Sequence, residues 1–359
     1  MSAPAVAPKI ERFLRLMTSR GASDFHLTVG RPPMLRVGGA MEPIRYRAIL
    51  EEDWVDLVRP IVPKHLYEEF AASGDADLAY EVPGLARFRV NLFRQQRGSG
   101  AVFRVIPTKI MTLEQLGMPE PVRRLATMES GLVLVTGPTG SGKSTTLAAI
   151  INLINETRNY HIITIEDPIE FVHSNKRCLV HQREIGTHAT TFAEALKAAG
   201  REDPDLILVG EMRDLETISM ALAAAEKGTI VFGTLHTNNA SKTVDRIISV
   251  YPANEQDGVR NVLGETLRAV VAQQLIPKIG GGRVAAMEVL FSSPAIGNMI
   301  REGKTPQITS AIQTGSKEGM IDMDTSIRQL YDERKITARA ALEKAIDKSQ
   351  FKDLAEPAG

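Results

Sequence analysis

One stretch, Gly137–Ser144, restricts the possible folds of this chain more than any other. It reads GPTGSGKS and fits the template G-x-x-x-x-G-K-[S/T]. The run before it, Leu132–Thr136, is typical of a strand buried on both faces, and Thr145–Ile151 begins as a helix. A strand, a glycine-rich loop and a helix in this order direct backbone N–H groups and a helix N-terminus at one point, where they bind phosphate. The sequence therefore predicts a P-loop that binds a nucleoside triphosphate.

The residues of this P-loop have separate expected parts in binding. Lys143 would reach the β- and γ-phosphates with its ammonium group, and Ser144 would place its hydroxyl on Mg²⁺. The glycines let backbone N–H groups turn inward around the β-phosphate. We therefore expect the nucleotide to contact Gly137, Pro138, Thr139, Gly140, Ser141, Gly142, Lys143, Ser144 and Thr145.

Three further apolar strands are predicted after the P-loop, and each leads into a polar side chain. The strands span residues 161–165, 206–209 and 229–233, and the side chains are Glu166, Glu211 and His236. Parallel sheets bind ligands at the carboxyl ends of their strands, so these groups are expected to converge on one nucleotide. Glu211 would hold Mg²⁺ directly or through water, Glu166 would be the general base for the attacking water, and His236 would sense the γ-phosphate. Taken singly, each side chain could instead cap a helix or meet solvent.

Charge and apolar content exclude several classes of protein. Basic and acidic residues both number 43, so no basic field suggests a nucleic acid or an anionic membrane as partner. No apolar run approaches the roughly 20 residues of a membrane span, and no signal peptide is predicted. The one cysteine, Cys178, excludes an internal disulfide and a four-cysteine zinc site, and we expect it to be buried. A cytosolic protein without direct membrane insertion or a nucleic-acid partner fits these features.

The chain divides into regions with different patterns. Residues 1–107 mix short strands with amphipathic helices, which predicts a small α+β domain. A linker follows at 108–118. From 119 to 359, strands alternate with helices, the sign of a parallel sheet in an α/β domain. From about residue 294 the pattern is helical and more polar.

Arginines alternate with apolar residues near the end of the first region. Arg87 and Arg89 share one face of a predicted strand, a pattern that usually marks a solvated face. Arg104 shares a face with Val102 and Ile106, where an apolar residue is expected, so it requires an anion as partner. A phosphate on a neighbouring subunit is one candidate for that anion.

Together these residues resemble the ATPase motors of the type II secretion and type IV pilus family. Four motifs carry the resemblance, namely the P-loop, the Asp box TIEDPIE at 164–170, the Walker B box REDPDLILVGEMRD at 201–214 and the His box GTLHT at 233–237. The resemblance implies a PAS-like N-terminal domain, a RecA-like P-loop core that uses ATP and Mg²⁺, and a homohexameric ring. The family places interface arginines at positions that match Arg89 and Arg104, and a match at Arg97 stays open.

Within this family the chain resembles the retraction branch, which implies a motor for pilin depolymerisation and twitching motility. The extension and secretion branches differ by an additional N-terminal domain and a four-cysteine zinc element, and neither is expected here. Residues 295–302 read AIGNMIRE and resemble the retraction signature AIRNLIRE, with Gly297 in place of arginine. We expect Gly297→Arg to preserve folding. The resemblance also implies recruitment from the cytoplasm to the inner-membrane base of the pilus machine, with a platform protein there as partner.

Other functions fit the same motifs. The chain could be an accessory or extension-type pilus or secretion ATPase. A RecA-like nucleic-acid motor would share the P-loop, although the balanced charge weighs against it. An ATP-gated structural subunit with little hydrolysis is a third class, and the presence of Glu166 and Glu211 argues against it.

Overall fold

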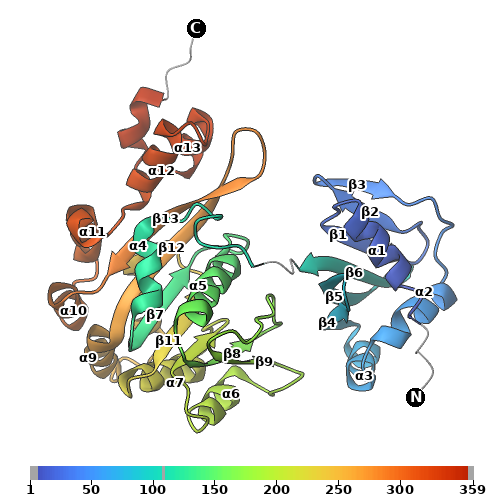
Figure 1. Cartoon of the computed structure of the whole chain (residues 1–359), viewed down its shortest axis with the longest axis horizontal. Helices are drawn as coiled ribbons and strands as arrows, with labels where there is room; N and C mark the ends of the chain where they lie inside the picture. Colours follow the sequence, from blue (N-terminus) through green and yellow to red (C-terminus); the bar gives the residue numbers. More distant parts are fainter. Residues whose placement is uncertain (1–6, 107–109, 355–359) are drawn as a thin grey trace. The chain divides into compact units, whose positions relative to one another are not determined.

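The computed structural model describes residues 7–106 and 110–354, and the chain divides into two compact units, Met1–Lys109 and Ile110–Gly359 (Figure 1). Each unit has its own sheet and hydrophobic core and is described by itself. Residues 108 and 109 of the predicted linker lie outside the described residues. The predicted fold class, a small α+β unit followed by an α/β core with a helical C-terminal part, is confirmed.

The N-terminal unit is built on a six-stranded sheet in the order β3-β2-β1-β6-β5-β4. All neighbouring strands are antiparallel. The strands are β1 Asp24–Thr28, β2 Met34–Val37, β3 Ala40–Pro43, β4 Asp75–Val82, β5 Ala86–Gln95 and β6 Gly98–Ile106. The helices are α1 Glu11–Ser19, α2 Glu51–Val58 and α3 Lys64–Ser73, with the 3-10 turn η1 Arg59–Ile61 after α2. The sequence pattern did not predict α3 and β4.

Alternation along the strands gives this sheet two different faces. Phe88, Val90 and Leu92 of β5 point into the core, which they share with Trp54 of α2. Arg89, between two of them, is exposed on the opposite face, which we call the outer face. Residues of all three helices belong to this core, whereas Arg89 and Arg104 on the outer face are exposed.

The C-terminal unit is built on a seven-stranded sheet in the order β13-β12-β7-β11-β10-β8-β9. Neighbouring strands are parallel except for the antiparallel pair β12 and β13. The strands are β7 Gly131–Thr136, β8 His161–Glu166, β9 Leu179–Glu184, β10 Leu206–Val209, β11 Ile230–Leu235, β12 Leu267–Pro277 and β13 Arg283–Phe291. The strands that carry the predicted motifs were correctly placed, whereas β12 and β13 were not predicted.

Helices surround this second sheet and continue beyond it. The helix α4 Glu120–Arg123 and the 3-10 turn η2 Arg124–Thr127 precede β7. The helices between the strands are α5 Lys143–Thr157, α6 Phe192–Ala199, α7 Leu215–Glu226, α8 Ala240–Ser249 and α9 Gln256–Thr266. After β13 follow α10 Pro294–Arg301, α11 Gln307–Thr314, α12 Met323–Asp332 and α13 Ala338–Lys344, with the 3-10 turns η3 Ser316–Glu318 and η4 Lys348–Leu354. In Figure 1, α12 and α13 lie at the end of the long β12–β13 ribbon.

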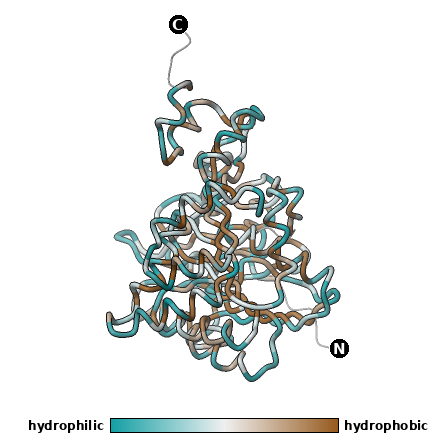
Figure 2. Tube along the Cα trace, turned by 90° about the vertical axis from the view of Figure 1, so that its left-hand side faces the viewer, coloured by the Kyte–Doolittle hydropathy of each residue, from teal (hydrophilic) through white to brown (hydrophobic). Residues whose placement is uncertain are grey.

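Burial follows the sequence pattern in this unit. Every residue of β7 is buried, as expected of a central strand in a parallel sheet. Cys178 is buried as predicted, one residue before β9. Figure 2 shows hydrophobic residues toward the inside of the fold and hydrophilic ones along the outer loops. Within residues 7–106 and 110–354, a helix with the length and apolarity of a membrane span is absent.

Gly297 lies in α10 at a close crossing with α9, and this contradicts one expectation. A Cβ atom added to Gly297 would lie 2.6 Å from the backbone oxygen of Gly264, and one added to Gly264 would lie 2.8 Å from that of Gly297. Carbon atoms do not approach a backbone oxygen so closely without displacing it. The expectation that Gly297→Arg preserves folding is therefore wrong for this helix pair, because any side chain would push the helices apart.

Candidate active site

The predicted P-loop joins β7 to α5 in a conformation that requires glycine. Gly137, Gly140 and Gly142 have φ angles of 144°, 77° and 90°, which side-chain-bearing residues rarely adopt. A Cβ atom on Gly137 would also collide with the backbone oxygen of Gln273. The loop tip is exposed, and α5 begins at Lys143, so free N–H groups of its first turn face the loop. This arrangement fits a phosphate group.

Lys143 folds back over the loop. Its Nζ donates to the backbone oxygens of Gly137 at 2.8 Å and Pro138 at 3.2 Å. Burial lowers the pKa of Lys143, while the charges of Glu211 and Glu170 act in the opposite direction. The ammonium group therefore lies inside the loop with two carboxylates in its field, where a phosphate would meet it.

Gln273 of β12 holds the P-loop against the sheet. Its Oε1 accepts from Thr146 Oγ1 at 2.8 Å, and its Nε2 donates to the backbone oxygen of Ser141 at 2.7 Å. Only 2% of Gln273 is exposed, so both bonds are shielded from water. Gln273 was not predicted as a site residue because β12 was not predicted. The two adjacent glutamines, Gln273 and Gln274, in an apolar run were the available signal.

Glu166 ends β8 and is held by its neighbours. Its Oε1 accepts from Thr164 Oγ1 at 2.6 Å and from Gln182 Nε2 of β9 at 3.2 Å. Burial raises the pKa of Glu166, although these hydrogen bonds act against the shift. A carboxylate with a raised pKa is a better proton acceptor, as a general base requires.

A cavity of about 30 Å³ connects Glu166 with the P-loop. Ser144, Glu166 and His173 are among its lining residues. His173 is 9% exposed, burial lowers its pKa to about 4, and its Nδ1 has no hydrogen-bond partner among the described residues. The space suffices for one water molecule. No role was predicted for His173, and the structure places it in the lining of the same cavity as Glu166.

Glu211 follows β10 and contacts two basic side chains. Arg213 Nη2 donates to its Oε2 at 2.6 Å, and His236 Nε2 lies 2.9 Å from its Oε1. Burial alone would raise the pKa of Glu211, but Arg213 and His236 outweigh this effect and lower it. The carboxylate is therefore ionised, as a metal ligand must be. Arg213 stands in the Walker B box, but no role was predicted for it.

The carboxyl edge of the sheet thus collects the predicted residues of this unit. The backbone N–H of Gly210 donates to the oxygen of Ile165 at 2.7 Å, which places the ends of β8 and β10 side by side. Among the described residues there is no cluster of three or more histidine, cysteine, aspartate or glutamate side chains that could hold a metal alone. The donors present, the Ser144 hydroxyl and the Glu211 carboxylate, suit Mg²⁺, which takes few protein ligands and completes its shell with phosphate and water.

The two predicted interface arginines lie on the outer face of the N-terminal sheet. Arg89 and Arg104 are opposite each other on β5 and β6. Arg104 has the anion partner that the sequence demanded, and it is Asp24 of the same chain, with Arg104 Nε 2.8 Å from Asp24 Oδ1. Because the units are described separately, these arginines are not placed with the P-loop.

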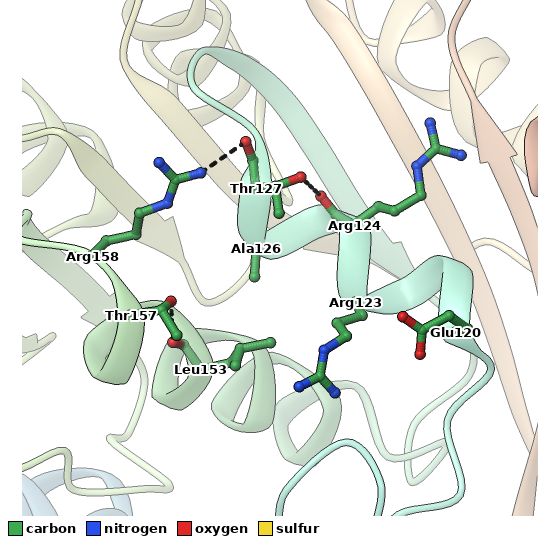
Figure 3. Close-up of a pocket in the computed structure, with 8 residues that line it drawn as sticks. All are labelled: Glu120, Arg123, Arg124, Ala126, Thr127, Leu153, Thr157 and Arg158. Atoms are coloured by element: carbon green, nitrogen blue, oxygen red, sulfur yellow. Dashed lines mark hydrogen bonds between the residues drawn. The ribbon is translucent and has the colours of Figure 1, made fainter.

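A larger pocket, of about 330 Å³, lies elsewhere in the C-terminal unit, between α4, η2 and the C-terminal half of α5 (Figure 3). Three arginines surround it, and each contacts a protein group. Arg158 Nη2 donates to the backbone oxygen of Thr127 at 3.1 Å, Arg123 pairs with Glu114, and Arg124 stacks on the Phe291 ring. None of the predicted site residues lines this pocket, so it is not part of the candidate site.

A protein-family model described as "Type II/IV secretion system protein" matches residues 72–281, more than half of the 359 residues. It runs across the boundary between the two units and includes the P-loop and the three other motifs.

Individual relatives agree with this match. The chain is 52% identical to the type IV pilus retractation ATPase PilT of Pseudomonas aeruginosa, over 94% of this chain and 98% of that protein. It is 51% identical to a twitching motility protein of Neisseria gonorrhoeae, over 87% of this chain and 84% of that protein. The crystal structure of the pilus retraction motor PilT with bound ADP superposes with a TM-score of 0.89 at 43% identity, covering 97% of this chain and 100% of that one. The chain therefore belongs to the type II/IV secretion system protein family, and within it to the type IV pilus retraction ATPases.

Proposed function

We propose that this retraction ATPase hydrolyses Mg-ATP as a homohexamer in which each active site combines residues of two neighbouring subunits. The observation that carries the proposal is the division of charged groups between the units. Lys143, Glu166, Glu211 and His236 meet at one sheet edge, whereas Arg89 and Arg104 lie exposed on a different sheet. An exposed arginine on a second unit is available to a neighbour's nucleotide.

Each residue at the sheet edge has a chemical part in this proposal. Lys143 binds the transferring phosphate and stabilises its charge. Ser144 and Glu211, the latter directly or through water, would hold Mg²⁺, which would supply positive charge to the phosphates. Glu166 accepts a proton from the attacking water. The water oxygen bonds to the γ-phosphorus, and the bond from that phosphorus to the oxygen shared with the β-phosphate breaks. His236 contacts Glu211 and senses the γ-phosphate.

Arg104, and with it Arg89, completes the site from the neighbouring subunit. A P-loop site leaves charge on the γ-phosphate that its own residues do not balance. An arginine supplied by a second subunit raises turnover by about 10³–10⁵ in comparable phosphoryl-transfer enzymes. Each subunit would then both hold a nucleotide and activate that of its neighbour.

The motor acts at the inner-membrane base of a type IV pilus machine, on its cytoplasmic side, with a platform protein of that machine as partner. Relatives of this chain are named as pilus retraction proteins, which supports this location. Coupling of hydrolysis to pilin removal requires contact with a component that touches the pilus, and ATP is available in the cytoplasm.

Deletion of the gene, followed by imaging of pili, tests the proposal. We expect cells with abundant pili that cannot twitch, restored by the wild-type gene and not by Lys143→Ala. Cells without pili would instead identify an extension motor. Restoration by Lys143→Ala would identify a structural subunit whose hydrolysis is not required.

A further inference from the structure

Four charged residues form a row across the outer face of the N-terminal sheet. In the strand register, Asp24 of β1 lies opposite Arg36 of β2 on one side and Arg104 of β6 on the other, and Arg104 lies opposite Arg89 of β5. We call these four residues the arginine row. It contains three arginines and one carboxylate, so it keeps a surplus of positive charge.

Asp24 is the buried centre of this row. Only 4% of it is exposed. Its Oδ1 accepts from Arg104 Nε at 2.8 Å, its Oδ2 accepts from Ser23 Oγ at 2.8 Å, and Arg36 Nε lies 3.9 Å from Oδ2. Burial alone would raise the pKa of Asp24, but the bonds from Ser23 and Arg104 outweigh it and lower the pKa. The carboxylate is therefore ionised under ordinary conditions.

Arg104 is held at one end and free at the other. A guanidinium group offers two pairs of N–H donors, and the bond to Asp24 engages Nε. None of the described residues accepts a hydrogen bond from the two terminal nitrogens of Arg104, and 69% of its side chain is exposed. The free edge of the group is the pair of terminal N–H groups that binds phosphate in a bidentate manner.

The positive charge of Arg89 makes the contact between Asp24 and Arg104 necessary. Arg89 and Arg104 are like charges on directly opposite strand positions, which repel each other. Without Asp24, Arg104 would be repelled by Arg89 and would sample many side-chain conformations. With Asp24, the plane of the guanidinium is fixed before any phosphate arrives, so less conformational freedom is lost on binding.

We propose that Asp24 is a positioning residue, which fixes Arg104 through Nε so that the terminal nitrogens face the phosphate of a neighbouring subunit. This inference rests on the proposed role of Arg104 between subunits. It adds a residue that touches no nucleotide, and it explains why a carboxylate is buried among arginines that bind an anion.

The test compares ATP turnover in three variants of the full-length protein. Asp24→Asn keeps the size and one hydrogen-bond acceptor but removes the charge, and we expect turnover to fall about 10- to 100-fold with the KM for ATP nearly unchanged. Arg104→Lys keeps the charge and the pairing with Asp24 but lacks the terminal pair of N–H groups, and it should lose activity to the extent that Arg104→Ala does. The matched control is Asp53→Asn, because Asp53 also pairs with an arginine of this unit, Arg47, away from the arginine row. It should leave turnover unchanged.

Combination with Arg104→Ala separates the two proposals. Asp24→Asn should add no further loss when Arg104 is already alanine. A wild-type rate in Asp24→Asn or in Arg104→Lys, or an equal additional loss in the Arg104→Ala background, would overturn the positioning role and leave the intersubunit arginine intact. A wild-type rate in Arg104→Ala would instead overturn the proposed role of Arg104 itself.

Discussion

Two buried carboxylates, one in each unit, have pKa values shifted in opposite directions. Glu288 of β13 and Asp24 of β1 are nearly equally buried, at 3% and 4% exposed. Glu288 accepts a hydrogen bond from the N–H of Ala240, and burial, together with the charges of Asp322 and Asp324, raises its pKa to about 7. Asp24 lies between arginines and has a lowered pKa.

The difference shows how charge is balanced in each unit. In the C-terminal unit, Glu166 accepts from a hydroxyl, Glu288 accepts from a backbone N–H, and Glu211 pairs with Arg213 and His236. The N-terminal unit instead places three arginines in line with one buried carboxylate, in the arginine row of an open sheet face. The free terminal nitrogens of Arg104 in this row are what a unit that serves a neighbour's nucleotide requires.

The largest expected effect concerns the base in the C-terminal unit. Glu166→Gln should lower ATP turnover by about 10²–10⁴, because the amide cannot accept the proton of the attacking water. Binding of ATP, measured by a fluorescent analogue, should be nearly unchanged. If the variant hydrolyses ATP at the wild-type rate, this edge of the sheet holds no essential base.

The second prediction contrasts the two buried carboxylates through the free energy of unfolding. A raised folded-state pKa means that Glu288 stabilises the fold when protonated and that this stability is lost as pH rises from about 4.5 to about 7. This difference in the free energy of unfolding amounts to at most about 3–4 kcal/mol. Glu288→Gln should remove this dependence and be more stable than the wild type above pH 7.

Asp24→Asn should behave in the opposite way, because a lowered pKa means stability that is present above the usual 3.8 and lost in more acidic solution. This variant should be less stable than the wild type at pH 7. Denaturant unfolding of both variants across pH measures the contrast, and the same sign of effect at pH 8 in both would contradict it.

The third prediction concerns the stability of the C-terminal unit, at the close crossing of α9 and α10. Gly297→Ala should destabilise the C-terminal unit by about 1–3 kcal/mol, because its Cβ atom meets the backbone oxygen of Gly264. Gly258→Ala in the neighbouring helix α9 is the matched control, since no atom lies within 4 Å of its added Cβ. The control should stabilise by about 0.5–1 kcal/mol. Equal stability of the two variants would refute the close helix crossing.

The smallest expected effect separates the two carboxylates of the site. Glu211→Gln should raise the Mg²⁺ concentration needed for half-maximal nucleotide binding about tenfold, because only Glu211 is assigned to the metal. Glu166→Gln should leave that concentration unchanged. Titration with Mg²⁺ at fixed ATP measures both, and the same shift in both variants would contradict the division of roles.

Local patterns predicted much of the C-terminal unit from the sequence. The P-loop and the strand ends at Glu166, Glu211 and His236 follow from apolar runs and from residues adjacent in the chain. The contacts that hold this site come from distant segments. Gln273 lies on β12, an unpredicted strand, and is 127 residues from Thr146, its hydrogen-bond partner.

In the N-terminal unit, too, a contact between distant segments could not be predicted from local patterns. The sequence indicated that Arg104 needs an anion, because a charged residue occupied an apolar position. Its partner Asp24 is 80 residues away and is brought to it only by the β1–β6 pairing. Strand order within an antiparallel sheet depends on tertiary packing rather than on local residue preference. Asp24 is therefore the first anion partner of Arg104, and a phosphate of a neighbouring subunit would be a second one.

A mixing experiment with Arg104→Ala and Lys143→Ala tests most directly whether the active site combines two subunits. Each variant alone should hydrolyse almost no ATP. In mixed rings, a Lys143→Ala subunit supplies its intact Arg104 to the intact P-loop of an Arg104→Ala neighbour, so activity should return and be greatest near equal proportions. Co-assembly is verified by pull-down of one tagged variant with the other. A normal rate for Arg104→Ala alone would contradict the account.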